Sequence, residues 1–496
     1  MRKSLTIWGA FLIGGALLMA ILFFAGRQPE ARLPGSAIPR PEESAPYVYY
    51  EGEGAGFSSY FMNNVVDERG IAGRFTGRLV PFFRLLEQCG DTALLVTWQN
   101  NRVTLTAAAT CPRTMLRAIG KGTIPEEWAT IPGLSVQTSE GEGLVLDGPA
   151  PLFPVRVTAD GGMVLMASSQ EELASMKTML ASAPGRIVTA WSLEKGWDNH
   201  VRIFDGGLFA QLAAIEKIPV TMGNLGIDVA WTETGRTGHL KWTTEGLAEL
   251  LPGGALDTLR PVSWNDRFFV TDPLIAAFGV NLPGYAVRRI TPSDMEDLTD
   301  VVGVGQSAMQ DFLPGPVMAS LGGKSKFLLF SLPGLLVQFP DRGAIGKAVV
   351  EAFWKNDWSS FVPKIDPLDG FTAGGTTTIP FSILGAASED MVALGLMDRD
   401  VLRQDRRGTL SAYLPALKAD DSALLWFYLD GLRLGQAMES LANAGRSVEK
   451  MGQTIGVNVD GFAETGTRLR RMGSLSLVMP TIGSGELRWT LPETAK

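Results

Sequence analysis

The side chains that most often carry catalysis are scarce in this chain. Histidine occurs only at His200 and His239, whose spacing is not that of a zinc site, and no cluster of cysteine and histidine accompanies them. A Ser-His-Asp triad needs a histidine as its base, so the sequence offers little material for one. We therefore predict no catalytic residue, no cofactor-binding residue, no cofactor and no metal ligand.

Short patterns that resemble catalytic motifs do not change this conclusion. Ser-x-x-Lys, the pattern of serine acylases, occurs at Ser192 with Lys195 and again at Ser447 with Lys450. The second copy falls inside an expected amphipathic helix, which shows how readily so short a pattern arises. The stretch SLGGKSK fails as a phosphate-binding loop, because Met318 stands where that loop requires glycine.

Pairs of carboxylates could hydrolyse an envelope polymer. Glu51 in EGEG, Glu140 and Glu142 in SEGEG, and Asp366 in DPLDG are candidates. The chain contains 52 acidic residues, so the sequence alone nominates no pair. Solvated loops are the simpler interpretation of these stretches.

Tryptophan is the remaining residue type that could bind a ligand. Trp191, Trp197, Trp354 and Trp358 lie in the body of the chain, and aromatic faces can hold sugars or apolar ligands. Tryptophan in a strand or helix more often packs in the core. We expect a core role for these four.

The two cysteines, Cys89 and Cys111, are predicted to form a disulfide. The stretch LLVTWQNNRVTLTAAA reads as a hairpin whose two-residue turn is Asn100-Asn101. This turn places residue 89 nearly opposite residue 112, at the open end of the hairpin. Closing this loop would stabilise the fold by about 3 kcal/mol in the chain-entropy model. A pair of reduced thiols is the alternative if the domain faces the cytoplasm.

Residues 5–26 are uncharged and mostly apolar, long enough as a helix to cross a bilayer. Arg2 and Lys3 precede them, and no small-x-small cleavage site follows. We expect an uncleaved signal anchor in the bacterial inner membrane, with a cytoplasmic N-terminus and a periplasmic or extracellular body. Residues 27–45 contain four prolines, a fifth follows at Pro46, and this density predicts an extended stalk. The bilayer would then be a partner, and a net charge of -8 argues against nucleic acid.

The body of the chain reads as two tandem copies of one module. The copies span residues 46–250 and 266–496, joined by a linker at 251–265 that contains glycine and proline. Each copy has hairpins with helices between them, which predicts an α+β fold of antiparallel sheet and helices. The corresponding stretches are residues 47–52 and 268–273, 80–96 and 313–329, 162–176 and 390–404, 204–212 and 429–437, and 222–227 and 472–477, with Asn100-Asn101 matched to the turn Pro333-Gly334.

The clearest correspondence is Gly-x-Leu-[Lys/Arg]-Trp-Thr, which occurs at residues 238–243 and 485–490. We expect this pattern to be the closing strand of each copy. Alternation with period two directs one set of side chains to the core, namely Leu240, Trp242, Leu487 and Trp489.

The second copy contains two insertions. The first begins with Thr291, Pro292 and Asp294, which predict the start of a helix. The second repeats Leu434, Leu441, Val448 and Ile455 every seven residues and predicts a long amphipathic helix. Packing against the protein's own sheet is the plain interpretation of this helix. An interface with an envelope protein or with a second copy of the chain is the alternative.

The chain resembles uncharacterised families of membrane-anchored bacterial surface or periplasmic proteins built from duplicated α+β modules. The resemblance is carried by the anchor, by a helix at Pro81 and Pro314 followed by a hairpin, and by the tryptophan of the last strand. It transfers no active residue. The first hypothesis is a non-enzymatic binding or scaffold module. The alternatives are a carrier of a lipid or apolar ligand, between the copies or on an open sheet face, and a carboxylate-dependent hydrolase.

Overall fold

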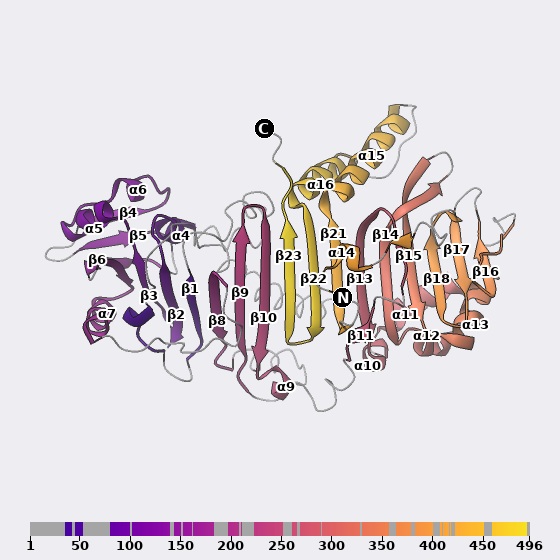
Figure 1. The fold of residues 1–496 in the computed structure, drawn as a ribbon, viewed down its shortest axis with the longest axis horizontal. Coiled ribbons are helices and arrows are strands. Elements are labelled where there is room, and N and C mark those ends of the chain that lie inside the picture. Colours follow the sequence, from indigo (N-terminus) through magenta and orange to yellow (C-terminus); the bar gives the residue numbers. More distant parts are fainter. Residues whose placement is uncertain are drawn as a thin grey trace. The chain divides into compact units, whose positions relative to one another are not determined.

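A computed structural model shows two compact units, Met1–Pro252 (unit 1) and Gly253–Lys496 (unit 2). The boundary falls inside the predicted linker 251–265. Each unit is built on an antiparallel sheet (Figure 1). The structure describes residues 35–41, 45–52, 80–99, 102–138, 143–149, 152–160, 162–182, 197–207, 210, 223–250, 260–264, 268–288, 290–327, 330–356, 364–377, 382–399, 407–408, 410–415, 417, 422–450 and 459–493.

Unit 1 is a sheet with short helices between its strands. The strands follow one another across it in the order β10-β9-β8-β1-β2-β3-β7-β6-β5-β4, and every pairing is antiparallel. The elements are η1 (Gly35–Ala37), β1 (Tyr47–Gly52), α4 (Val80–Glu87), β2 (Thr92–Gln99), β3 (Arg102–Thr110), α5 (Arg113–Gly120), α6 (Glu126–Ala129), β4 (Ser135–Thr138), β5 (Leu144–Asp147), β6 (Val155–Asp160), β7 (Met163–Ala167), α7 (Gln170–Ser182), β8 (Asn199–Phe204), β9 (Gly226–Thr234), β10 (Thr237–Glu245) and α9 (Leu247–Leu250).

Unit 2 has the sheet order β23-β22-β21-β13-β14-β15-β18-β17-β16, again antiparallel throughout. Two small ladders, β11 with β20 and β12 with β19, accompany it. The elements are β11 (Val262–Ser263), β12 (Val270–Thr271), β13 (Leu274–Leu282), α10 (Gly284–Val287), α11 (Pro292–Val302), α12 (Gln306–Phe312), β14 (Gly315–Phe327), β15 (Phe330–Pro340), α13 (Gly343–Phe353), β16 (Ala373–Thr376), β17 (Ile383–Ala387), β18 (Met391–Leu396), β19 (Arg407–Gly408), α14 (Leu410–Tyr413), β20 (Ser422–Ala423), β21 (Leu425–Asp430), α15 (Gly431–Lys450), α16 (Val459–Met472), β22 (Ser474–Thr481) and β23 (Ser484–Thr490).

The strand orders of the two sheets correspond place by place. In each, a closing hairpin is followed by the strand before it in sequence, then by the unit's first long strand, and then by the next hairpin. Three of the matched sequence stretches fall on strands at the same place in both sheets. They begin at β7 and β18, at the end of β8 and β21, and at β9 and β22.

The predicted fold class, an α+β protein with an N-terminal transmembrane helix, is wrong. Antiparallel sheet dominates the described residues, and helices are the minor component. Among the helices that the structure describes, none combines the length and the apolar character needed to cross a membrane. The expected span, residues 5–26, lies outside the described residues.

The stalk predicted for residues 27–45 is also partly wrong. Ala37 and Ile38 are fully buried and belong to the core of unit 1, together with Tyr49 of β1 and Met176 of α7. An extended stalk would leave these side chains in water, whereas burying the isoleucine alone is favourable by roughly 1.5–3 kcal/mol. Residues 35–38 are therefore part of the folded body.

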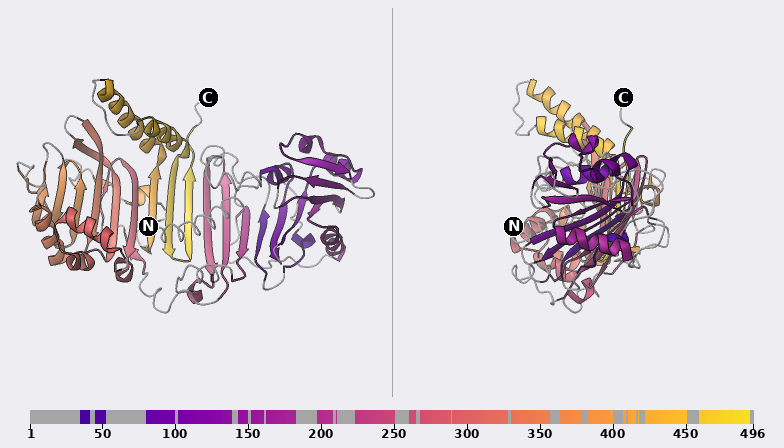
Figure 2. Two further views of the ribbon diagram at one scale, coloured as in Figure 1. Left: turned by 180° about the vertical axis from the view of Figure 1, so that it is seen from behind. Right: turned by 90° about the vertical axis from the view of Figure 1, so that its left-hand side faces the viewer.

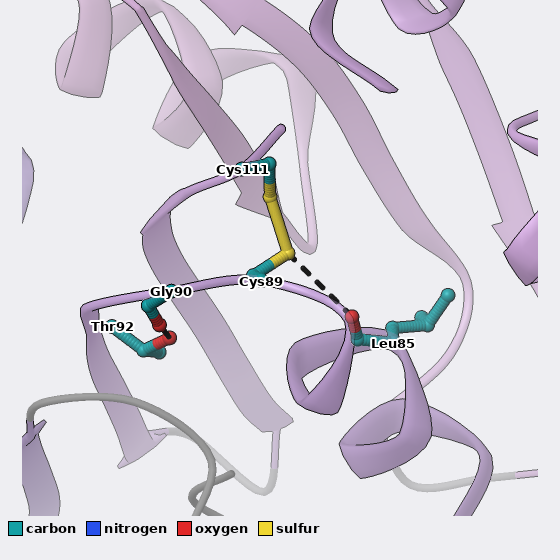
Figure 3. The surroundings of a disulfide bond; sticks show 5 residues. All are labelled: Leu85, Cys89, Gly90, Thr92 and Cys111. Carbon is teal, nitrogen blue, oxygen red and sulfur yellow. Dashed lines mark hydrogen bonds between the residues drawn. A yellow bond between two sulfur atoms is a disulfide. The ribbon is translucent and has the colours of Figure 1, made fainter. Parts of the chain in front are cut away.

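The first hairpin has the register that the sequence predicts. Gln99 pairs with Arg102, which places the turn at residues 100–101, outside the described residues. Cys89 and Cys111 are within disulfide distance, with Cα atoms 4.5 Å apart (Figure 3). The Sγ atom of Cys89 lies 3.6 Å from the carbonyl oxygen of Leu85, which is in the last turn of α4. The pair therefore fastens α4 to the open end of the β2–β3 hairpin.

Three of the matched pairs of stretches do not correspond in the structure. Residues 80–87 form helix α4, whereas Pro314 follows helix α12 and directly precedes strand β14. The predicted turn Pro333-Gly334 lies inside β15, because a β-bulge after Gly322 lets the long hairpin continue to Phe327 and Phe330. Residues 268–273 precede β13, the strand that takes the place of β1.

The two insertions predicted in the second copy contain helices α11, α15 and α16. Helix α11 begins as predicted: Pro292 is its first residue, and the Thr291 side chain accepts a hydrogen bond from the Asp294 backbone N–H. Helix α15 carries Leu434, Leu441 and Val448 of the predicted helix, and residues 451–458, which include Ile455, lie outside the described residues. Helix α16 follows and packs against α15 as a hairpin.

The closing strands of the two units are β10 and β23. Leu240 and Trp489 are buried, whereas Trp242 and Leu487 are half-buried. In each strand the tryptophan lies on the same face as the leucine two residues before it, as period-two alternation requires.

Candidate functional site

One face of unit 1 gathers most of the charged side chains of its sheet. Register places Glu51 of β1 opposite His200 of β8, and Arg202 of β8 opposite Asp228 of β9. Side chains two residues apart on a strand share a face, so these four lie on the same side as Glu245 of β10. We call this set the charged face.

An ion-pair network joins three strands of the charged face. The guanidinium of Arg202 lies 2.7 Å from a carboxylate oxygen of Glu245 and 3.4 Å from one of Asp228, whose side chain is only 3 % exposed. Burial lowers the pKa of Arg202, but the two carboxylates outweigh burial, so its pKa is raised. Burial also raises the pKa of the Tyr47 hydroxyl beside this arginine. The ion pairs of Arg202 with Asp228 and Glu245 therefore link β8, β9 and β10 and give these carboxylates a structural role.

The two histidines, remote in sequence, lie on this same face. His239 of β10 packs its ring against Trp197, with ring centroids 4.8 Å apart, and the Lys241 ammonium lies 5.9 Å from the Trp197 ring centroid. Burial lowers the pKa of His200, although Asp228 acts in the opposite direction. His200 is therefore neutral at pH 7 and adds no positive charge to the face.

The other residues singled out by sequence do not join this cluster. Asp366 forms an isolated bridge with Thr376 and pairs with Lys364 at 3.0 Å. The indole N–H of Trp354 donates to the Gly385 carbonyl at 2.6 Å, so Trp354 is a core residue of unit 2. Ser447 and Lys450 lie on helix α15. Glu140, Glu142, Trp191, Ser192, Lys195 and Trp358 lie outside the described residues.

The residues of the amphipathic helix predicted as a possible interface lie in different environments. Leu434 of α15 is half-buried, Leu441 is exposed, Val448 lies near the end of α15, and Ile455 lies outside the described residues. In the side view of Figure 2 the α15–α16 hairpin leans out of the plane of the unit 2 sheet. Gly435 of α15 and Gly466 of α16 let the two helix backbones approach closely.

A second candidate is an uncovered apolar face in unit 2. Phe278 of β13 is 47 % exposed, Leu335 of β15 is 45 % exposed and Leu396 of β18 is 47 % exposed. Leu335 pairs with Leu396 on one side and with Leu321 of β14 on the other, and Leu396 pairs with Ile383 of β17. We call these five side chains the open face.

The open face continues a buried core in the same side of the sheet. Two and four residues along the same strands, Val337 is partly buried, and Phe339 and Val392 are buried beneath α11, α12 and α13. The alternate side chains, such as Leu336 and Ala393, are buried on the opposite face. The three helices thus cover one end of this sheet face and leave its other end exposed.

Sequence reasoning missed both faces. The charged face depends on the register of four strands, which no local pattern reveals. The open face does have a signal: β15 and β18 are apolar at consecutive positions, as in strands buried on both sides. That pattern does not tell where the covering layer ends.

Comparison with known proteins returns no match for this chain: no protein-family model, curated protein or solved structure is significantly similar to it.

Proposed function

We propose that this protein is a non-enzymatic binding module that takes up an apolar ligand on the open face of unit 2. The observation that carries the proposal is the direct pairing of two leucines, Leu335 and Leu396, each nearly half exposed, on neighbouring strands. Contiguous exposed apolar side chains mark interaction surfaces in soluble folds. Covering one such leucine fully contributes about 1.5–3 kcal/mol, and half-exposed side chains contribute correspondingly less.

The charged face of unit 1 is the competing candidate, and its contacts favour a structural role. Arg202 engages Asp228 and Glu245 together, which satisfies the charges within the sheet. A hydrolase would need one carboxyl kept protonated beside one kept ionised. The two carboxylates beside Arg202 are instead held against one and the same guanidinium.

The compartment we propose for this module lies outside the cytoplasm. The support is the disulfide-distance pair of Cys89 and Cys111, because disulfides persist in oxidising compartments such as the periplasm. Attachment to the inner membrane through residues 5–26 remains a prediction from the sequence.

The test is binding of Nile red, an uncharged apolar dye, to the purified full chain. We expect its fluorescence to rise on binding to the native protein, and the rise to be largely lost in the double variant L335Q/L396Q. The matched control is Ile124→Gln, which changes an apolar side chain of unit 1 with a similar exposure of 39 %. Equal dye binding by the native protein and the double variant would overturn the proposal.

A further inference from the structure

We propose that the ligand of the open face is a single-chain amphiphile with an acidic head group, such as a fatty acid, whose head group is held by Lys324 and Lys326. This inference rests on the proposed function and adds the chemical class of the ligand. It follows from the shape of the open face and from the charges at one end of it.

The open face is a narrow row of side chains that crosses the strands. Ile383, Leu396, Leu335 and Leu321 are register neighbours on four consecutive strands, β17, β18, β15 and β14. Strands lie about 4.8 Å apart, so the row is about 14 Å long. On β13 the register neighbour of Leu321 is Ala276, and Phe278 lies on the same face two residues further along, opposite Ala319. A row of this length and one side chain in width suits one extended hydrocarbon chain.

No charged side chain interrupts the row. All five members of the open face are hydrocarbon side chains, so nothing in the row would solvate a buried polar group of the ligand. An ionic group placed there would lose its hydration without a partner, at a cost of several kcal/mol. Any charged part of the ligand must therefore lie at an end of the row.

Positive charge gathers beyond the row, where β14 continues past Leu321 to Phe327. Positions 331, 333 and 335 of β15 share one face of the sheet, because alternate residues of a strand point the same way. Lys326 is the register partner of Ser331, so it lies on the same face as Leu335. Lys324 lies within the bulge, and its carbonyl accepts a hydrogen bond from the Asp398 N–H at 2.8 Å. Lys324 and Lys326 therefore lie together at this end of the row, beside Asp398.

Among the described residues near this end, the charges leave a positive excess. Asp398 has an oxygen 3.8 Å from the Lys326 ammonium, which is a long contact to a side chain that is 57 % exposed. Asp272 also lies near the bulge, but it accepts a hydrogen bond at 2.8 Å from Tyr413 of α14, which belongs with the core of the opposite sheet face. Lys324 is also exposed. In a chain of net charge -8, this local excess favours an anionic head group.

The test compares two ligands that share a tail and differ in the head group. Dodecanoate and 1-dodecanol, both below their micelle concentrations, are titrated against Nile red bound to the full chain. We expect K324E/K326E to weaken dodecanoate binding about tenfold and to leave dodecanol binding unchanged, since each exposed charge contact is worth up to about 1 kcal/mol. Raising the NaCl concentration should weaken dodecanoate binding to the native protein and leave dodecanoate binding to K324E/K326E unchanged.

Lys347→Glu is the control, because it makes one substitution of the same kind at an exposed position on α13. Circular dichroism and thermal melting check that each variant is folded. Equal loss of both ligands in K324E/K326E, or equal affinity of the native protein for both together with no salt effect, would overturn the head-group inference while leaving the apolar site intact. If L335Q/L396Q still bound both ligands as tightly as the native protein does, the proposed function itself would be contradicted.

Discussion

Leu335 and Leu396 face each other across the antiparallel ladder of β15 and β18, and each exposes nearly half of its side chain. Their neighbours in sequence, Leu336 and Gly395, are likewise paired, and Leu336 is fully buried on the opposite face. The same two strands therefore contribute one face to the core and the other to solvent. This contrast gives the first prediction.

Replacing Leu335 with glutamine should change stability little, whereas Leu336→Ala should cost about 2–5 kcal/mol because it removes a buried side chain and leaves a cavity. Urea unfolding of the two variants measures the difference. A large loss of stability in L335Q would mean that the open face is covered in the folded protein.

Arg342 predicts a large effect on the stability of unit 2. Its Nε donates to the Phe312 carbonyl at 2.6 Å and its Nη1 to the Pro340 carbonyl at 2.8 Å. Nη2 reaches two more carbonyls, of Leu313 and Pro316. Burial lowers the pKa of Arg342, so the charge is held at a cost that these bonds offset.

Arg342→Met should therefore destabilise the protein by roughly 3 kcal/mol or more, because it strands several buried carbonyls. Arg342→Lys should lose less stability than Arg342→Met, because lysine keeps the positive charge and can replace some of the hydrogen bonds to the carbonyls. Thermal unfolding of the two variants tests this order. A methionine variant as stable as the native protein would show that the carbonyls find other partners.

His200 predicts a loss of stability in acid. Burial lowers the pKa of the folded histidine below its unfolded value of about 6.5. Below that unfolded pKa the unfolded chain binds more protons, so stability rises with pH there and falls as the pH drops. Above pH 6.5 both states are neutral and the contribution is constant.

Urea midpoints at pH 7.5 and 5.5 measure this effect. The native protein should lose more stability between the two than His200→Gln, which cannot titrate at this position. An identical pH dependence in the two proteins would contradict the burial of a neutral His200.

The α15–α16 hairpin predicts a requirement for glycine at position 435. A Cβ atom placed on Gly435 would collide with the Gly466 carbonyl, and one on Gly431 with the Leu469 carbonyl. Gly435→Val should separate the helices and increase amide exchange along α15. Gly120→Ala, at the end of helix α5 with open space around it, is the control and should be neutral or slightly stabilising. Unchanged exchange in G435V would show that the helices can shift without loss.

The sequence predicts those parts of the fold that short-range rules determine. A two-residue turn determines the register of β2 and β3, and this register brings Cys89 to Cys111. Thr291 and Pro292 specify the start of α11 by hydrogen bonding and by a fixed backbone angle. The tryptophan pattern of β10 and β23 works for the same reason, since alternation is a local property.

The misplaced turn at Pro333-Gly334 shows where local rules end. These residues read as a turn, but the bulge after Gly322 and pairing over a long hairpin keep them within β15. Likewise, no local rule reveals that α11–α13 cover Phe339 and stop short of Leu335. The extent of a covering layer is set by tertiary packing, which a single sequence does not display.

Photocrosslinking is the most direct test of the open face. The full chain is incubated with dodecanoate carrying a diazirine near the end of its tail, irradiated, digested and sequenced by mass spectrometry. We predict crosslinks in the peptides that carry Leu335 of β15 and Leu396 of β18, and their loss in L335Q/L396Q. Crosslinks confined to other peptides, or unchanged in that variant, would contradict the assignment of the open face as the ligand site.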